Sequence, residues 1–376
     1  MKINLPELPE SVLLEIFSPS VIVCRDRVRA NIDEMIRVAG SVDRLRPHCK
    51  THKMADVVRM LLNRGISKHK AATIAESEML ADAGARDVML AYNPVGPNIG
   101  RMVRLAKRFR DCLFSVTCDH EKPLRQLSAA LSNEPGLIIG VFLDINPGLN
   151  RTGVLPESDD ALRLYSLISE LPGIRPAGFH VYDGQHRQAS LDERRVAVKK
   201  EFDRAVAFRG RCLAAGLKVP AMVCGGTPTF PVYAESTEEG VELSPGTIIF
   251  HDAGYGNAFP DLNFQPAAFT LTRVISRPAA DRLTLDLGNK AVAADPPKGN
   301  RVFFPELPDA VQDLHNEEHL ALITPDAGRY QPGDVVLGIP MHVCPTSALH
   351  ASVTVIDDGR IVSEWPVTSR NRRITI

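Results

Sequence analysis

The chain lacks any run of apolar residues long enough to span a membrane, which argues against a transmembrane protein. Its opening stretch, MKINLPELPESVLLEIF, is interrupted by prolines and glutamates where a secretory signal peptide would be continuously apolar. We therefore expect a cytoplasmic protein with no membrane partner.

The chain also lacks an excess of either charge and any close pairing of cysteines. Its 44 Lys and Arg residues nearly balance its 45 Asp and Glu residues. A nucleic-acid-binding protein usually carries a basic excess, so we expect no nucleic-acid partner. The seven cysteines are odd in number and contain no CxxC pair, which argues against a secreted disulfide framework.

A chain of 376 residues is long for one hydrophobic core, so two domains are expected. From about residue 20 to about residue 250, short β-rich runs alternate with amphipathic segments of helix length, which is typical of βα units and a parallel sheet. About eight such units match a (β/α)8 barrel, although an open doubly wound sheet has the same local pattern.

The expected strands can be located by their apolar and β-branched residues. They are SVIVC at Ser20 to Cys24, a run around Leu45 to Pro47, Ala71 to Ile74, DVMLAY, LFSVTC, IIGVFLDI, RPAGFHVY, VPAMVC, and GVELSPG followed by TIIF. After about Leu262, short alternating strands joined by Gly, Pro and Asp turns predict an antiparallel β-domain. We assign residues 17–262 to the barrel and residues 263–376, with 1–16, to the β-domain.

The stretch RPHCKTHK places Lys50 directly after a predicted strand, where the catalytic groups of a parallel barrel lie. Other unusual residues also follow predicted strands, and all are expected to face one pocket: Asn150, Arg151, Tyr182, Asp183, Gly225, Gly226, Thr227, Gly246 and Thr247. Glycine lets backbone N–H groups approach a phosphate closely, and a lysine can form an imine with an aldehyde cofactor. The pattern therefore predicts a phosphate-bearing cofactor.

The triplet His342-Val343-Cys344 suggests a metal site. In a strand, residues two apart share a face, so an imidazole and a thiolate would bind one ion together. Such a pair suits Zn²⁺ best, with Mn²⁺ or Co²⁺ as alternatives. By itself the triplet also fits a strand histidine beside a buried thiol.

Five motifs together resemble the pyridoxal-phosphate (PLP) enzymes of the alanine-racemase-like group, and within it the D-threonine aldolase and D-serine dehydratase families. They are RPHCKTHK, LNRTGV, VYDGQH, GGTPT and HVCPTSALH. The resemblance implies a PLP-binding barrel, a C-terminal β-domain and a homodimer. It also implies that Lys50 is the Schiff-base lysine, that Arg151 faces the pyridine nitrogen and that Tyr182 lies beside the ring.

The resemblance assigns further roles to residues of both predicted domains. The expected phosphate contacts are Gly225, Gly226, Thr227, Gly246 and Thr247, and His48 is assigned to the same cofactor site. His342 and Cys344 resemble the metal ligands of the group, in which His pairs with Cys in the dehydratases and commonly with Asp in the aldolases. Glu317, in HNEEHL, is expected to hold a metal-bound water, and His186 is a candidate catalytic base.

The resemblance implies a lyase that cleaves D-3-hydroxy amino acids into glycine and an aldehyde. The alternative is a dehydratase that converts D-serine or D-3-hydroxyaspartate into a 2-oxo acid and ammonia. The PTSALH tail resembles the aldolases, whereas Cys344 resembles the dehydratases. An amino-acid racemase fits less well because the racemases lack the His-Cys pair, and a non-enzymatic PLP carrier fits less well because such carriers are barrel-only chains.

Overall fold

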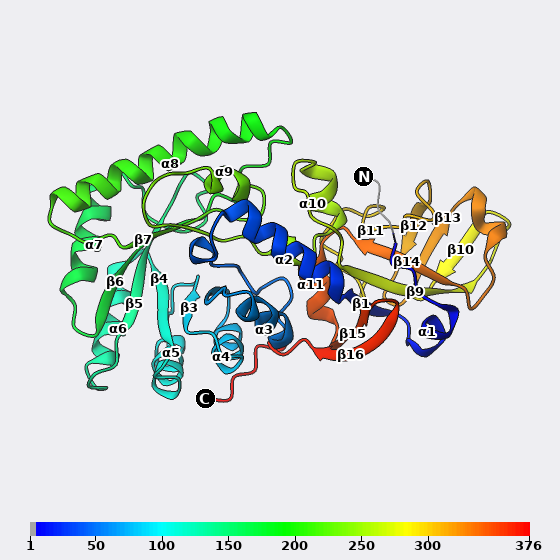
Figure 1. Cartoon of the computed structure of the whole chain (residues 1–376), viewed down its shortest axis with the longest axis horizontal. Coiled ribbons are helices and arrows are strands. Elements are labelled where there is room, and N and C mark those ends of the chain that lie inside the picture. The colour runs from blue at the N-terminus through cyan, green and yellow to red at the C-terminus, as the bar shows by residue number, and fades with distance from the viewer. Residues whose placement is uncertain (1–4) are drawn as a thin grey trace. The chain divides into compact units, whose positions relative to one another are not determined.

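The computed structural model describes residues 5–376, which divide into two compact units (Figure 1). The first unit combines the residues up to Met35 with Thr51–Met54 and Thr247–Asn371. The second unit combines Ile36–Lys50, Ala55–Gly246 and Arg372–Ile376. No helix within residues 5–376 is both long and apolar enough to cross a membrane. The expected domain boundary between residues 262 and 263 stays a prediction, and residues 1–4 of the expected β-domain lie outside the described residues.

The second unit is built around a parallel sheet of seven strands whose spatial order follows the sequence. The strands are β2 (Lys68–Ala71), β3 (Asp87–Leu90), β4 (Leu113–Cys118), β5 (Ile139–Ile145), β6 (Ile174–Val181), β7 (Ala221–Cys224) and β8 (Val241–Leu243). Nearly every residue of these strands is buried, as expected for a parallel sheet covered by helices.

The segment from Leu45 to His48 occupies the place of an eighth strand. Leu45 pairs in parallel with Leu243 of β8, and His48 pairs in parallel with Lys70 of β2. The N–H of Lys70 donates to the carbonyl of Pro47 at 2.9 Å. Because this segment joins the last strand to the first, it closes the sheet, and the expectation of a barrel is confirmed.

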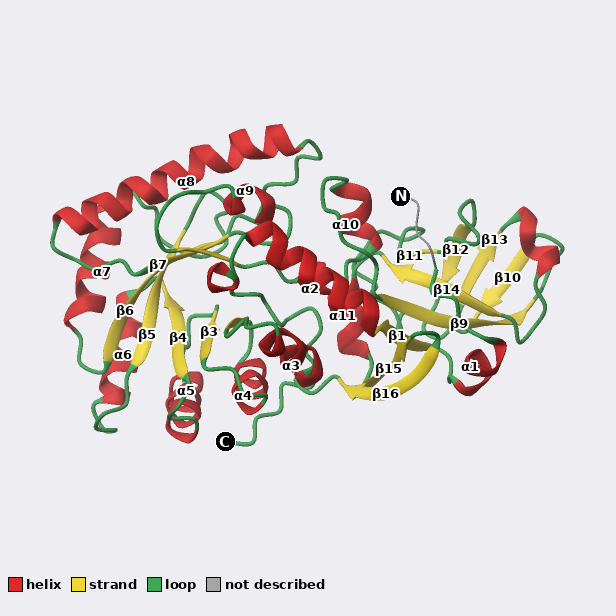
Figure 2. Ribbon diagram, in the orientation of Figure 1, coloured by secondary structure: helices red, strands yellow, loops and turns green. Residues whose placement is uncertain are grey.

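Helices connect the strands and cover the outside of this sheet (Figure 2). They are α3 (Ala55–Asn63), α4 (Ile74–Asp82), α5 (Pro97–Arg108), α6 (Glu121–Leu131), α7 (Asp159–Glu170), α8 (Leu191–Ala214) and the short α9 (Phe230–Ala234). Three of them begin at a hydroxyl residue, Thr73, Ser158 or Ser190, whose side chain accepts a backbone N–H of the first turn. The preceding helix α2 (Arg25–Ala39) contributes residues to both units.

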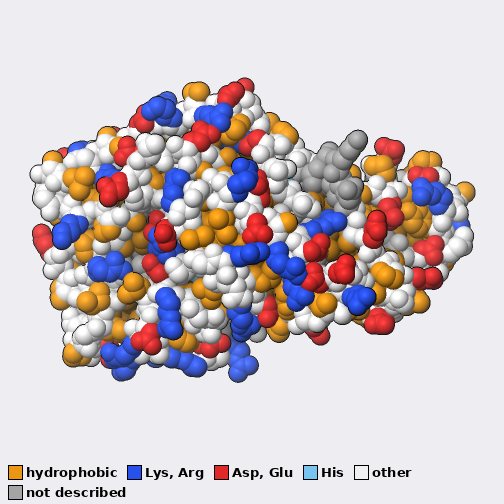
Figure 3. All heavy atoms as spheres, viewed as in Figure 1, with side chains coloured by type: hydrophobic (Ala, Val, Ile, Leu, Met, Phe, Trp, Pro, Cys, Tyr) orange, Lys and Arg blue, Asp and Glu red, His pale blue; other side chains and the backbone are white. Residues whose placement is uncertain are grey.

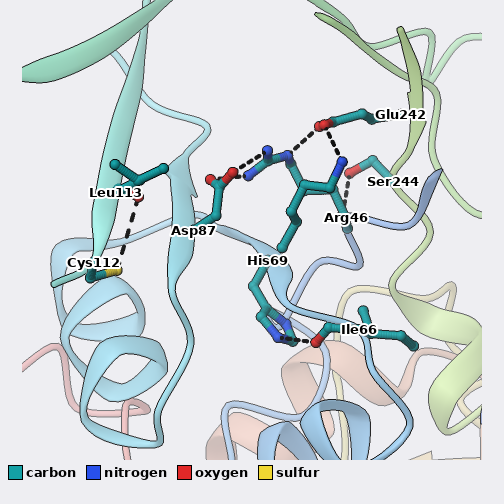
Figure 4. A network of polar contacts seen from close by, with 9 residues as sticks. Arg46, Ile66, His69, Asp87, Cys112, Leu113, Glu242 and Ser244 are labelled. Carbon is teal, nitrogen blue, oxygen red and sulfur yellow. Dashed lines mark hydrogen bonds and ion pairs between the residues drawn. The ribbon is translucent and has the colours of Figure 1, made fainter. Parts of the chain in front are cut away.

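A buried arginine fixes the closing segment (Figure 4). The guanidinium of Arg46 donates to both carboxylate oxygens of Asp87, at 2.7 and 3.0 Å, and to Glu242 at 2.5 Å. Lys68 also pairs with Glu242, at 2.6 Å. Burial alone would lower the pKa of Arg46, but the two carboxylates raise it well above its usual range. Arg46 therefore stays charged and ties the closing segment to β3 and β8.

Replacing Arg46 with alanine is expected to lower the free energy of unfolding by about 3 kcal/mol, because it removes the ion-pair partner of Asp87 and one of the two partners of Glu242. Lys68→Ala is the matched control, since it removes a more exposed partner of the same Glu242 and is expected to cost about 1 kcal/mol. Urea unfolding followed by circular dichroism measures both. Equal losses of unfolding free energy in the two variants would mean that the Arg46 network does not stabilise the closed barrel.

The first unit contains a mainly antiparallel sheet with strand order β12-β13-β10-β9-β1-β15-β16, in which β14 also pairs with β9 and β11 pairs with β14. The strands are β1 (Ser20–Cys24), β9 (Ala268–Ser276), β10 (Arg282–Leu285), β11 (Val302–Phe303), β12 (Val311–His315), β13 (Leu320–Ile323), β14 (Val335–Pro340), β15 (Ser352–Asp357) and β16 (Arg360–Pro366). Its helices are α1 (Glu10–Glu15), α10 (Ala253–Ala258) and α11 (Val343–Leu349). The expected antiparallel β-domain is confirmed.

Three strand predictions were wrong. Ser20–Cys24 is not a barrel strand: Ile22 pairs antiparallel with Phe269 of β9 and parallel with Thr354 of β15. The strand expected at Ala71 to Ile74 begins and ends earlier, as β2, and Thr73 caps helix α4 instead. The TIIF segment forms a 3-10 helix, Thr247–Ile249. A short apolar run fits either sheet, so its sequence does not specify the partner strand.

Charges of both signs are interspersed over the face of the molecule drawn in Figure 3. Lys and Arg side chains lie among Asp and Glu side chains on that face. Among the described residues, several ion pairs join side chains one helix turn apart, such as Arg125 with Glu121 at 2.7 Å and Lys199 with Asp203 at 2.7 Å. Such exposed pairs contribute little to stability but keep the surface polar.

Candidate active site

Lys50 lies in a turn directly after the segment that closes the barrel. The N–H of Cys49 donates to the carbonyl of Lys70 on β2 at 2.9 Å, which holds the turn against the neighbouring strand. Lys50 Nζ lies 5.9 Å from the centroid of the Tyr182 ring. The lysine therefore stands at a strand end of the barrel, as the sequence predicts, and its amine faces an aromatic residue from the end of β6.

A buried group of His48, Cys49 and Glu76 supports this turn. Their donor atoms lie within 4.8 Å of one another, a spacing that metal ligands can have. Hydrogen bonds already link them: Cys49 donates to Glu76 at 3.7 Å, and Glu76 also accepts the N–H of Ala72 at 2.6 Å. His48 Nδ1 accepts the N–H of Lys50 at 3.2 Å. We interpret the group as a brace that joins the Lys50 turn to the start of α4.

Three basic side chains surround the Tyr182 ring. Arg151 approaches it most closely, with Cζ 4.5 Å from the ring centroid, and the amines of Lys50 and Lys70 lie at 5.9 and 5.8 Å. The sequence predicted that Lys50, Arg151 and Tyr182 would meet, and the structure brings them together. Lys70 was not predicted.

The loop that carries Arg151 is held by the side chain of Asn146. Its Oδ1 accepts the N–H groups of Gly148 and Asn150, at 3.0 and 3.1 Å, and its Nδ2 donates to Asn150 at 2.9 Å. Asn150 has a positive φ of 57°, which asparagine tolerates better than most residues. A Cβ on Gly153 would lie 2.7 Å from the Asn146 nitrogen. The loop therefore has one tight conformation, which aims Arg151 at the ring.

The glycine turns predicted to bind phosphate lie beside Tyr182. Gly225 has a φ of +68°, and a Cβ there would lie 2.7 Å from Thr229 Oγ1, while a Cβ on Gly226 would lie 3.1 Å from Tyr182 Cε2. Thr227 Oγ1 accepts the N–H of Gly246 at 3.2 Å, which joins the two turns. Gly225 has no room for a side chain and Gly226 has little, so the backbone of the first turn passes close to the Tyr182 ring. The N–H groups of Gly225 and Gly226 donate to the Val181 carbonyl and to Thr229 Oγ1, at 2.8 and 3.2 Å. The residues present thus fit a ring with a phosphate arm.

Thr247 was predicted as a phosphate contact, and the structure places it in the first unit. Its hydroxyl lies 3.7 Å from the sulfur of Cys344. Whether it contacts phosphate stays a prediction.

A buried hydrogen-bonded chain runs inward from the same strands. Asp144 on β5 contacts His180 on β6, with Oδ1 2.7 Å from Nδ1, and His180 Nε2 lies 3.3 Å from Lys70 Nζ. All three side chains are buried. Sequence reasoning missed these residues, although charged residues within buried strands are a signal that can be recognised.

His186 and Asp183 lie in the loop after β6. His186 Nε2 is 2.9 Å from Glu201 on α8, which fixes the orientation of its ring. Asp183 accepts the hydroxyl of Thr229 at 2.8 Å. Burial raises the pKa of Asp183 to about 6, although the Thr229 hydrogen bond opposes this change. The loop thus holds a carboxyl group with a raised pKa, at Asp183, and an imidazole oriented by a carboxylate, at His186.

The predicted metal pair does not lie in a strand. Strand β14 ends at Pro340, His342 is the N-cap of α11, and Cys344 lies in its first turn, so the reasoning from a shared strand face was wrong. Cys344 nevertheless lies close enough to His342 to raise the pKa of the imidazole. The Asp295 carboxylate lies 2.5 Å from His342 Nδ1, and the Thr51 hydroxyl lies 3.2 Å from Cys344 Sγ.

The protonation of His342 reflects these neighbours. Burial alone would lower its pKa, but Cys344 and Asp295 outweigh burial and raise the pKa of His342 to about 9. Asp295 occupies Nδ1, which leaves Nε2 as the nitrogen for a metal. An imidazole and a thiol side by side, with a carboxylate behind the imidazole, fit a zinc-type donor set. Sequence reasoning missed Asp295.

Glu317, predicted to hold a metal-bound water, lies in the exposed turn after β12. Its carboxylate pairs with Lys290 at 2.6 Å, and Lys290 also contacts Glu318 at 3.2 Å. Hydrogen bonding and the charge of Lys290 lower the pKa of Glu317. Its role toward a metal stays a prediction.

Comparisons with known proteins agree with this architecture. Residues 23–253 match the family described as alanine racemase, N-terminal domain, and residues 267–356 match the putative serine dehydratase domain. The chain is 31% identical to a D-threonine aldolase of Arthrobacter sp, covering 97% of this chain and 96% of that protein. It is 27% identical to a 3-hydroxy-D-aspartate aldolase of Paracoccus denitrificans (strain Pd 1222), covering 98% of this chain and 96% of that protein.

A solved structure extends the likeness to three dimensions. The D-threonine aldolase from Filomicrobium marinum superposes with a TM-score of 0.88 at 28% identity, covering 96% of this chain and 97% of that one. A lysine-bearing barrel with a β-domain of this kind defines an alanine-racemase-like PLP enzyme. The chain belongs to the D-threonine aldolase family of PLP-dependent lyases. The family resemblance of its motifs is thereby confirmed.

Proposed function

We propose that this chain is a PLP- and divalent-metal-dependent lyase that cleaves D-3-hydroxy amino acids into glycine and an aldehyde. The observation that carries the proposal is its likeness, along nearly the whole chain, to aldolases that differ in the substrate named for them, D-threonine in one and 3-hydroxy-D-aspartate in another. Carbon–carbon bond cleavage is the reaction that these names share.

In this proposal, Lys50 attaches PLP covalently and the residues around Tyr182 orient it. Arg151 would face the pyridine nitrogen, and the turns that contain Gly225, Gly226 and Gly246 would contact the phosphate. When bound, PLP stabilises the negative charge that develops at the substrate Cα. His186, oriented by Glu201, is the proposed base for the β-hydroxyl proton.

In the first unit, His342 and Cys344 are the proposed metal ligands, with Zn²⁺ favoured over Mn²⁺ or Co²⁺ by the thiol. A divalent ion held there would supply a Lewis acid for a hydroxyl oxygen. Asp295 would orient the His342 ring through Nδ1. Glu317 would hold a water on the ion. We also propose a cytoplasmic homodimer, and light scattering that gives the mass of one chain for a fully active enzyme would refute the dimer.

The alternative function is dehydration of D-serine or D-3-hydroxyaspartate. It is favoured by the match of residues 267–356 to a serine dehydratase domain and by the thiol at Cys344. In that reaction the α-proton is removed and hydroxide leaves from Cβ, so the products differ from those of an aldolase.

Product analysis separates these functions. The enzyme is incubated with D-threonine, D-phenylserine, D-serine and D-3-hydroxyaspartate, and the mixtures are assayed for glycine, aldehyde, 2-oxo acid, ammonia and the L-enantiomer. We expect glycine and an aldehyde in equal amounts. A 2-oxo acid with ammonia would establish the dehydratase instead, and conversion to the L-enantiomer alone would establish a racemase.

A further inference from the structure

Lys70, on the inward face of β2, is a buried lysine that the proposed function leaves unused. Its side chain is only 2% exposed. Burying an ammonium group is costly unless the group is paired or gives up its proton. The hydrogen-bond partner of Lys70 is a ring nitrogen of His180 at 3.3 Å, not a carboxylate. A lysine in this environment favours its uncharged form.

The histidine is itself fixed by a carboxylate. Asp144 Oδ1 lies 2.7 Å from His180 Nδ1, so that nitrogen carries the hydrogen and donates it. Burial lowers the pKa of His180 against the opposing effect of Asp144, which keeps the ring neutral. A neutral ring with hydrogen on Nδ1 has an acceptor at Nε2. His180 therefore accepts a hydrogen bond from Lys70 and holds its amine in one direction.

Charged and titratable groups face Lys70 from each neighbouring strand. They are Arg46 and Lys50 from the closing segment, Asp144 from β5, His180 from β6 and Cys224 from β7. Burial has the largest effect and, with the charge of Lys50, lowers the pKa of Lys70 to about 7, although Asp144 opposes the change. The amine also lies 5.8 Å from the centroid of the Tyr182 ring, beside which Lys50 and Arg151 lie.

We propose that Lys70 is a second acid–base group of the PLP site, which takes a proton from the substrate beside Tyr182 and returns it. The inference rests on the proposed function, because it assumes that PLP is attached to Lys50 beside the same ring. In the step, a C–H or O–H bond of the substrate breaks, its proton becomes the third N–H of Lys70, and the electron pair stays on the substrate atom. His180 and Asp144 are positioning residues that aim the amine.

The main test compares Lys70→Met with wild type, both loaded with PLP. Wild-type turnover is expected to fall about tenfold per pH unit below about pH 7, as Lys70 becomes protonated. Lys70→Met is expected to lower turnover at pH 8 by about 100-fold to 10 000-fold. It is also expected to remove the decline of turnover at acidic pH, which we call the acid limb. Lys68→Met is the matched control, because Lys68 lies two residues earlier on the same face and pairs with Glu242. Lys68→Met should keep both the wild-type turnover and the acid limb.

A second variant protects the test against a simple folding failure. Asp144→Asn leaves Lys70 in place but removes a negative charge that raises its pKa, so the acid limb is expected to move to lower pH. A merely structural role for Asp144 would change turnover without moving the limb. Nuclear magnetic resonance of ¹³C-labelled lysine in the PLP-free chain gives an independent measurement. One lysine should titrate near pH 7, and its signal should vanish in Lys70→Met.

The outcomes separate this inference from the proposed function. If borohydride fixes PLP to Lys50 but Lys70→Met keeps its turnover within about threefold and keeps the acid limb, the inference is wrong and the proposed function stands. If no PLP is attached to Lys50 in wild type, both fail. A limb that stays in place in Asp144→Asn, with Lys70 titrating above pH 9, also overturns the inference.

Discussion

Replacing Lys50 with alanine is expected to abolish turnover, by at least about a thousandfold, equivalent to about 4 kcal/mol of transition-state stabilisation. The amine at the end of the closing segment is the proposed attachment point for PLP, and alanine cannot form an imine. The purified wild type should be yellow, and the variant should lack the absorbance band of the attached cofactor. Spectra and product formation from D-threonine measure the two effects together.

Peptide mapping identifies the lysine directly. Borohydride treatment should abolish the band and fix PLP to the peptide that contains Lys50. Lys53→Asn is the matched control, because Lys53 lies three residues away in the same motif and has a positive φ of 56°, which asparagine tolerates. It should keep both the band and the turnover. Labelling at Lys53, Lys70 or Lys290 in the wild type would contradict the assignment.

Removing the metal is expected to abolish turnover while leaving the PLP absorbance in place. His342 and Cys344 belong to the first unit, whereas Lys50 belongs to the second, so the two groups are held by different parts of the chain. A chelator should inactivate the enzyme, and Zn²⁺, Mn²⁺ or Co²⁺ should restore it. Full activity in both the chelated enzyme and Cys344→Ala would refute the metal proposal.

Two substitutions are expected to change the affinity or the preference for the metal without abolishing binding. Asp295→Asn is expected to weaken metal affinity by about 10-fold to 100-fold, because the amide no longer orients His342 as the carboxylate does. Asp326→Asn, an exposed carboxylate of the same unit, serves as its control. Cys344→Asp should shift preference toward Mn²⁺ or Mg²⁺, since a carboxylate is a harder ligand. Calorimetric titration with each ion gives the affinities.

The metal affinity should also depend on pH in a defined direction. The pKa of His342 is raised to about 9 by Cys344 and Asp295, against the effect of burial. A metal must displace that proton, so binding weakens as pH falls below this value. Affinity that rises with acidity would exclude His342 as a ligand.

The barrel and its strand-end residues were predictable because local patterns determine them. Alternating apolar strands and amphipathic helices specify βα units, and all such units place their strand ends at one edge. Lys50, Arg151 and Tyr182 therefore meet although about 130 positions separate the first from the last in the sequence. The glycine turns were recognisable for the same reason.

Pairings between distant segments were not predictable from local patterns. The run SVIVC suits a buried strand of either sheet, and only its contacts with β9 and β15 decide between them. Strand β2 has the sequence KHKA, whose charged residues resemble a loop. The partners of these lysines, Glu242 on β8 and His180 on β6, are distant in the sequence. Neither Lys68 nor Lys70 was therefore expected in the core.

For the metal pair, the sequence predicted correctly that His342 and Cys344 lie close together, but wrongly that they lie in a strand. Residues two apart do not face each other within a helix, but His342 is an N-cap with extended backbone, which leaves it close to Cys344. Asp295 lies 47 positions before His342 in a loop, and a lone aspartate there carries no local signal. Its role becomes visible only when the fold brings the two side chains together.

The pairing of β1 with β15 also governs how the chain is made. A ribosome releases Ile22 well before its partner Thr354, which follows 332 residues later (354 − 22). At about 5–20 residues per second, the newborn strand waits on the order of tens of seconds for that neighbour. The stretch Ala55–Gly246 is complete well before then. The first unit therefore begins before the second, but its sheet is completed only after the seven strands of the second unit have been made, and until then the apolar SVIVC strand lacks its β15 partner.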